Sequence, residues 1–127
     1  MLIKPITYTD FDGNKKTKNF HFNLNRTECL EFNIDAGSVG LKKLLEKMVQ
    51  EEDIKRLYEW FKKIVLASYG ERSIDGDRFV KTEELTKAFE QSNAYDELMM
   101  ELFTGGEKAV ADFISAVIPQ VNDTPNT

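Results

Sequence analysis

The sequence contains few of the residues from which catalytic and metal sites are built. It holds one cysteine, Cys29, and one histidine, His21, among 127 residues. A lone cysteine excludes an internal disulfide and favours a reducing compartment, and Cys29 is interpreted as a small apolar helix residue. His21 lies between two phenylalanines of a predicted strand and is interpreted as a solvent-facing strand residue. Neither residue indicates a nucleophile with its base or a metal site.

Phosphate-binding loops and catalytic carboxylate pairs are also missing. Gly105-Gly106 follows a predicted helix and lacks the Lys-Ser/Thr that completes a nucleotide-binding loop. Adjacent acids such as Glu83-Glu84 fall at predicted helix starts, where negative charge stabilises the helix dipole. We therefore predict a protein that is not an enzyme and that carries no metal or cofactor.

Long hydrophobic runs and an excess of basic charge are absent as well. No segment approaches the length of a membrane span, and residues 1–7 lack the apolar run of a signal peptide. The formal net charge is −5, and lysines and arginines are scattered among acids. Nucleic-acid binders usually carry a basic excess or a dense basic face. The sequence thus predicts no membrane and no nucleic acid as partners.

The first 24 residues have the pattern of a β-hairpin. Apolar and polar residues alternate around Ile6 and Tyr8 and again around Phe20 and Phe22. Between these runs lies Asp12-Gly13-Asn14, whose residues tolerate the positive φ of tight hairpin turns. Proline cannot donate to a ladder, so Pro5 belongs at a strand start or on an edge. A lone hairpin is marginal in water, and we expect its phenylalanine face to pack on helices.

The rest of the chain predicts helices separated by caps and breakers. They run from about Thr27 to Ile34, from a Ser38 cap to about Val49, from the acids at 51–53 to Gly70, from a Thr82 cap to about Phe89, from Ser92-Asn93 to Gly105-Gly106, and from there to Pro119. We expect an α+β fold. One globular domain spans residues 1–118, with the hairpin (1–24) packed on about six helices (25–118), and a disordered polar tail follows (119–127).

One segment, Glu71–Leu85, imitates a calcium-binding EF-hand loop. With Glu84 as the twelfth ligand, Ser73, Asp75 and Asp77 take the first, third and fifth positions. Arg78 then occupies the sixth position, where the loop needs glycine, and sliding the frame puts Thr82 at the twelfth. An ordinary inter-helix loop is the favoured interpretation. A degenerate EF-hand-like calcium-binding regulatory module remains an alternative.

Three segments together resemble a known family. They are Ile6–Asn14 with Phe20–Leu24, Ala67–Leu85, and Ala94–Leu102 with Ala111–Ile114 and Val117–Pro119. In this order and spacing, the chain is similar to the tail assembly chaperones of long-tailed (siphovirus-type) phages or prophages of Gram-positive bacteria. The similarity spans nearly the whole chain, and none of its segments is a catalytic signature.

The resemblance implies the partner and the setting. A tail assembly chaperone binds the tape measure protein, keeps it soluble and promotes assembly of the tail tube around it. Further implied partners are the tail tube protein and a frameshifted, longer form of the chaperone itself. The expected location is the host cell cytoplasm, and the protein leaves before the virion matures. A permanent structural tail or connector component is the other alternative.

Candidate contact residues follow from side-chain type and helical position. Met99, Met100 and Phe103 are flexible or broad side chains of the kind found at adaptable binding surfaces. Met100 and Trp60 lie beside the apolar stripes of their predicted helices rather than on them. Packing at the edge of the core is the alternative for both. We predict Trp60, Met99, Met100 and Phe103 as partner-binding residues.

Overall fold

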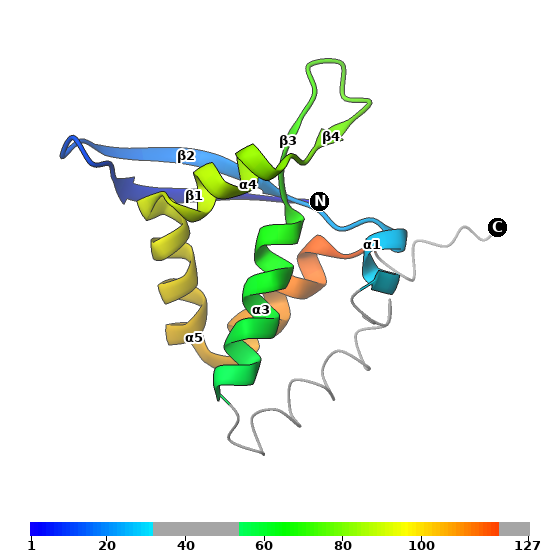
Figure 1. Ribbon diagram of the computed structural model, residues 1–127. Coiled ribbons are helices and arrows are strands. Elements are labelled where there is room, and N and C mark those ends of the chain that lie inside the picture. The colour runs from blue at the N-terminus through cyan, green and yellow to red at the C-terminus, as the bar shows by residue number, and fades with distance from the viewer. Residues whose placement is uncertain (32–53, 120–127) are drawn as a thin grey trace.

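The computed structural model describes residues 1–31 and 54–119, which form an antiparallel sheet and helices (Figure 1). The elements are β1 (Leu2–Thr9), β2 (Lys15–Phe22), α1 (Arg26–Glu31), α3 (Ile54–Ser68), β3 (Tyr69–Arg72), β4 (Phe79–Val80), α4 (Glu83–Glu90) and α5 (Asn93–Val117). The four strands follow the order β1-β2-β3-β4. The α+β class predicted from the sequence is confirmed.

The predicted N-terminal hairpin is confirmed, and its turn has the expected chemistry. Gly13 adopts a φ of 86°, and the Asp10 carboxylate accepts the backbone N–H groups of Asp12 (3.0 Å) and Asn14 (2.9 Å). Pro5 lies inside β1 opposite Asn19. This position is tolerated because β1 is an edge strand of the sheet.

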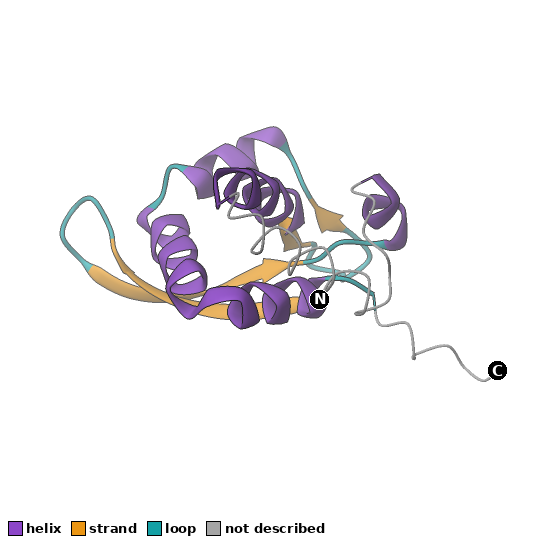
Figure 2. Cartoon of the chain, turned by 90° about the horizontal axis from the view of Figure 1, so that it is seen from below, coloured by secondary structure: helices purple, strands orange, loops and turns teal. Residues whose placement is uncertain are grey.

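One face of the hairpin packs on the helices, as its phenylalanine pattern predicted. Ile6 and Phe22 are buried, and the Phe22 ring lies 5.3 Å from Phe113 of α5 and 5.7 Å from Phe89 of α4. Each large apolar side chain that is fully buried contributes about 1.5–3 kcal/mol. Viewed from below, the turn end of the hairpin extends beyond the helices (Figure 2). The side chain of Phe11 at this tip is 80% exposed.

The prediction of an inter-helix loop after Gly70 is wrong, because β3 and β4 form a second hairpin there. Helix α3 ends at Ser68. The Ser68 carbonyl accepts a hydrogen bond from the Asn23 N–H (2.7 Å), which brings β3 beside the end of β2. Gly70 lies within β3 rather than at the end of the helix. A Cβ atom at this position would lie 2.6 Å from the Phe79 ring and 2.7 Å from the Val80 carbonyl. Glycine therefore permits the close approach of β3 and β4.

The expectation of about six helices is not supported, because the structure has four helices within residues 1–31 and 54–119. The two predicted C-terminal helices both lie within α5, on either side of a kink at Gly106, whose φ of 79° and ψ of −163° are not helical. The break predicted at Gly105-Gly106 is therefore confirmed. The helix predicted after Ser38 lies outside the described residues, as do residues 32–34 and the predicted tail from 120 onward.

The predicted helix boundaries at Thr82, Ser92 and Pro119 are confirmed. The Thr82 hydroxyl accepts the N–H of Leu85 (3.1 Å) at the start of α4, and Ser92 caps α5 in the same way. Helix α5 ends at Val117, two residues before Pro119. Within the described ranges, no helix combines the length and apolar character needed to cross a membrane.

Candidate partner-binding surfaces

The structure places the four predicted contact residues in different environments. Met99 is buried in the core, with 6% of its surface exposed, whereas its neighbour Met100 is 60% exposed. Trp60 on α3 and Phe103 on α5 are partly buried and pack against the core. Edge-of-core packing, the alternative considered for Trp60 and Met100, thus describes Trp60 but not Met100. Met100 is the side chain of this set that is presented to solvent.

Phe103 and Met100 belong to an apolar edge where α3 and α5 meet, here called the α3–α5 edge and defined by Tyr58, Met100 and Phe103. The Phe103 ring lies 5.6 Å from the rings of both Tyr58 and Phe61. Tyr58 is 39% exposed. Met100 is adjacent to Phe103 on the helix surface, because residues three apart in a helix are neighbours. Trp60 makes no ring contact with Phe103 in the described part of the chain, so the structure does not bring all four residues together.

On its other side, Met100 borders a hollow between α5 and β1. Pro5 and Thr7 of β1 face Glu97 and Glu101 of α5 across this hollow. An ion pair between Lys4 and Glu101 (2.7 Å) links the two elements. Met100 is therefore an apolar side chain between an aromatic edge and a charged, strand-lined hollow, an arrangement open to contact from outside.

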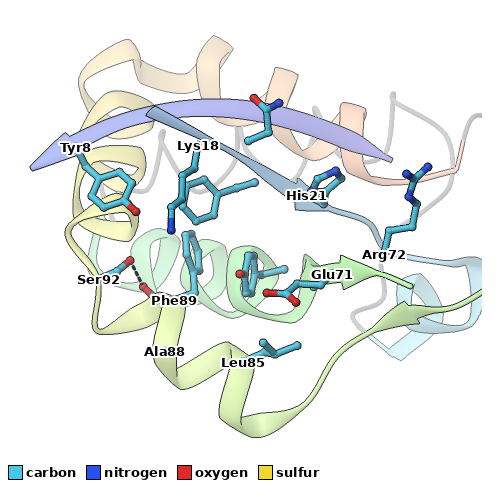
Figure 3. Close-up of a pocket in the computed structure, with 13 residues that line it drawn as sticks. Tyr8, Lys18, His21, Glu71, Arg72, Leu85, Ala88, Phe89 and Ser92 are labelled. Carbon is cyan, nitrogen blue, oxygen red and sulfur yellow. Dashed lines mark hydrogen bonds between the residues drawn. The ribbon is translucent and has the colours of Figure 1, made fainter. Parts of the chain in front are cut away.

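A second hollow, of about 460 Å³, lies between the hairpin, β3 and α4 (Figure 3). It is called here the aromatic groove, and its floor is formed by Phe20, Tyr69 and Phe89. The rings of Tyr69 and Phe89 are stacked with centroids 4.3 Å apart, and Phe20 lies 5.4 Å from Phe89. Leu85 and Ala88 of α4 complete an apolar wall.

Polar and charged side chains line the rim of the aromatic groove. Tyr8 and Lys18 reach from the hairpin toward Phe89, and His21 and Arg72 lie at the other end (Figure 3). Neither Lys18 nor Arg72 forms an ion pair within the described residues. Burial, and secondarily the nearby Glu71 carboxylate, raises the pKa of the Tyr69 hydroxyl.

The EF-hand-like segment does not have EF-hand architecture, because strands rather than helices flank its acidic loop. The loop is closed by its own groups: Ser73 donates its hydroxyl to the Asp75 carboxylate (2.6 Å), which also accepts the Asp77 N–H (3.0 Å). The Ser73 hydroxyl bond contributes most to the lowered pKa of Asp75. Over the parts of the chain that the structure describes, no three His, Cys, Asp or Glu side chains gather in a metal-binding group.

Sequence reasoning did not identify the aromatic groove. The residues of its floor come from β2, β3 and α4, and the local sequence around each of them predicts only a core residue. The pairing of β3 with β2 brings them together, and that pairing depends on a hairpin that the sequence pattern did not reveal. The sequence offered a weaker signal: the chain has nine phenylalanines, and two of them, Phe20 and Phe22, lie at the end of a lysine-rich strand.

Comparison with known protein families gives a match over nearly the whole chain. A family model described as "Phage tail assembly chaperone" matches residues 1–122. No match was found among curated proteins or among solved structures.

Proposed function

The chain belongs to the phage tail assembly chaperone family, whose model matches residues 1–122, and we propose that it binds the tape measure protein. Binding keeps that long client soluble and promotes assembly of the tail tube around it. The match along nearly the whole chain is the observation that carries this function.

A physical need for such a partner follows from the chemistry of the client. A tape measure protein that has not yet been enclosed is a long helical chain with apolar stripes, and exposed apolar surface of that extent leads to aggregation. The α3–α5 edge offers a complementary surface, since Met100 is 60% exposed and Tyr58 39% exposed. Methionine adapts its shape to irregular apolar partners. We assign first contact to Met100, with Phe103 and Trp60 beside the core as supporting residues.

The same role sets the location and the other partners of the chain. It acts in the host cell cytoplasm, in a siphovirus-type phage or prophage of a Gram-positive host, and it leaves before the virion is complete. The tail tube protein and a frameshifted, longer form of the chain are the further expected partners.

Co-expression with the tape measure protein from the same genome tests this function. We expect the client to remain in the soluble fraction as a complex that holds several copies of the chain, because each copy covers a short length of a long client. The complex should persist in moderate salt, which screens exposed charges beyond about 8 Å at physiological strength, because its contacts are largely apolar. A client that stays insoluble with and without the chain would contradict the proposal.

A further inference from the structure

Strand β2 has a free edge beside the aromatic groove. It pairs with β1 along its whole length but with β3 only at His21 and Phe22. The N–H of Asn23 donates to Ser68 on the β3 side. Backbone groups alternate sides along a strand, so His21, Asn19 and Thr17 also direct their N–H and C=O groups to that side. His21 lies opposite Gly70, whereas no strand of the described residues lies opposite Asn19 or Thr17.

The free edge opens directly onto the groove. Lys18, Asn19 and Phe20 of β2 are among the residues that line the hollow (Figure 3). An added strand would lie about 4.8 Å from β2, and its side chains would point alternately to the two faces of the sheet. On the inner face, they would meet the floor formed by Phe20, Tyr69 and Phe89. The site therefore combines unpaired backbone groups with an apolar pocket for alternate side chains.

The positive charge of strand β2 favours an acidic partner strand. Strand β2 has the sequence Lys-Lys-Thr-Lys-Asn-Phe-His-Phe, with three lysines and no acid, in a chain whose net charge is −5. Lys16 pairs with Asp10 (2.8 Å), whereas Lys15 and Lys18 have no ion pair in the described residues. Two copies of β2 would bring these lysines together, which destabilises strand pairing. An acidic strand from a different protein would relieve this repulsion.

We propose that the β2 edge and the aromatic groove form a docking site for an extended acidic segment of another protein. The segment adds to the sheet as a strand, accepts and donates hydrogen bonds at Thr17 and Asn19, and seats a large apolar side chain on the aromatic floor. Recognition by strand addition obtains affinity from the main chain and specificity from such pockets. This site is separate from the α3–α5 edge and does not rest on the tape measure function.

Titration with synthetic peptides, followed by NMR, tests the site. The probe is a capped peptide in which glutamate and valine alternate around a central phenylalanine, and the control peptide carries lysine in place of glutamate. We expect saturable binding of the acidic peptide and slower hydrogen exchange at the Thr17 and Asn19 amides when it is bound. The lysine peptide should bind at least about ten-fold more weakly.

Two proline variants separate strand addition from other binding modes. Asn19→Pro removes an N–H that points away from β1, so it leaves the hairpin ladder intact. Thr7→Pro makes the equivalent change on the outer edge of β1, which already contains Pro5. We expect Asn19→Pro to weaken binding of the acidic peptide about ten-fold and Thr7→Pro to leave the peptide's affinity unchanged. Lys18→Glu, a surface change that should not affect folding, should also weaken binding of the acidic peptide.

Three results would contradict the proposal of a docking site at the β2 edge. The first is failure of the acidic peptide to bind the native chain at millimolar concentration. The second is equal affinity for the native chain, Asn19→Pro and Lys18→Glu. The third is binding that shifts amides of the α3–α5 edge and leaves those of Thr17 and Asn19 unchanged.

Discussion

At the scale of single residues, Met99 and Met100 show what side-chain type and helical position can predict. Both were selected as adaptable contact residues, and the structure buries one and exposes the other. The observation that Met100 lies outside the apolar stripe of its helix predicted this difference. Cys29, interpreted as a small apolar helix residue, is 3% exposed within α1, which confirms that interpretation. Burial, and then the neighbouring Glu28, raises the pKa of its thiol.

Aspartate substitutions at the two methionines separate folding from client binding. Met100→Asp should change the free energy of unfolding by no more than about 0.5 kcal/mol, because the side chain is 60% exposed. It should weaken the complex with the tape measure protein about ten-fold. Met99→Asp buries a charge and should destabilise the fold by about 2–5 kcal/mol. Urea denaturation and affinity measurements on both variants check this, and normal client binding by a folded Met100→Asp would remove Met100 from the contact surface.

At the scale of elements, caps and turns were predictable, whereas the second hairpin was not. The Asp12-Gly13 turn and the Thr82 cap are set by local chemistry, so they can be identified from a few adjacent residues. Strands β3 and β4 have four and two residues, too short for a visible alternation. The pairing of β3 with β2 joins segments that are distant in the sequence, as the hydrogen bond from the Asn23 N–H to the Ser68 carbonyl shows. For the same reason, the sequence did not reveal the aromatic groove.

The bend of α5 depends on Gly106. Its backbone, at φ 79° and ψ −163°, lies in a region that is essentially restricted to glycine. Gly106→Ala should therefore cost about 1–3 kcal/mol of stability. Thr104→Ala, an exposed change in the same helix, is the matched control and should be nearly neutral. Equal urea midpoints for Gly106→Ala and the parent would show that the bend does not need glycine.

The loop between β3 and β4 should not respond to calcium. Its Asp75 carboxylate already accepts the Ser73 hydroxyl and the Asp77 N–H, and the sixth position of the EF-hand frame is Arg78. We expect millimolar calcium to leave the melting temperature unchanged relative to a chelator control. Binding at a hundred times the dissociation constant would add about 2.7 kcal/mol, which a thermal melt detects readily. A calcium-dependent rise that Asp75→Asn abolishes would instead favour the calcium-binding module.

At the scale of the whole molecule, the class of fold and the family could be recognised from the sequence, but the arrangement of the elements could not. The alternation in residues 1–24 and the helical periodicity thereafter led to an α+β fold with its phenylalanine face on helices. The helix break predicted at Gly105-Gly106 is confirmed by the non-helical backbone of Gly106, because a glycine pair usually marks such a break. The angle between the two helical segments depends instead on how residues 107–117 pack. That packing involves Val110, Phe113 and Ile114, which join the core formed with the hairpin.

We propose that this chain is a transient assembly partner of the tape measure protein rather than a lasting part of the tail. Quantitative mass spectrometry of two preparations tests this proposal: the tape measure protein purified from cells that lack the tail tube protein, and tails purified from mature virions. We expect several copies of the chain per tape measure protein in the first preparation and none in the second. A fixed stoichiometry of the chain in mature tails would contradict it and identify a structural component.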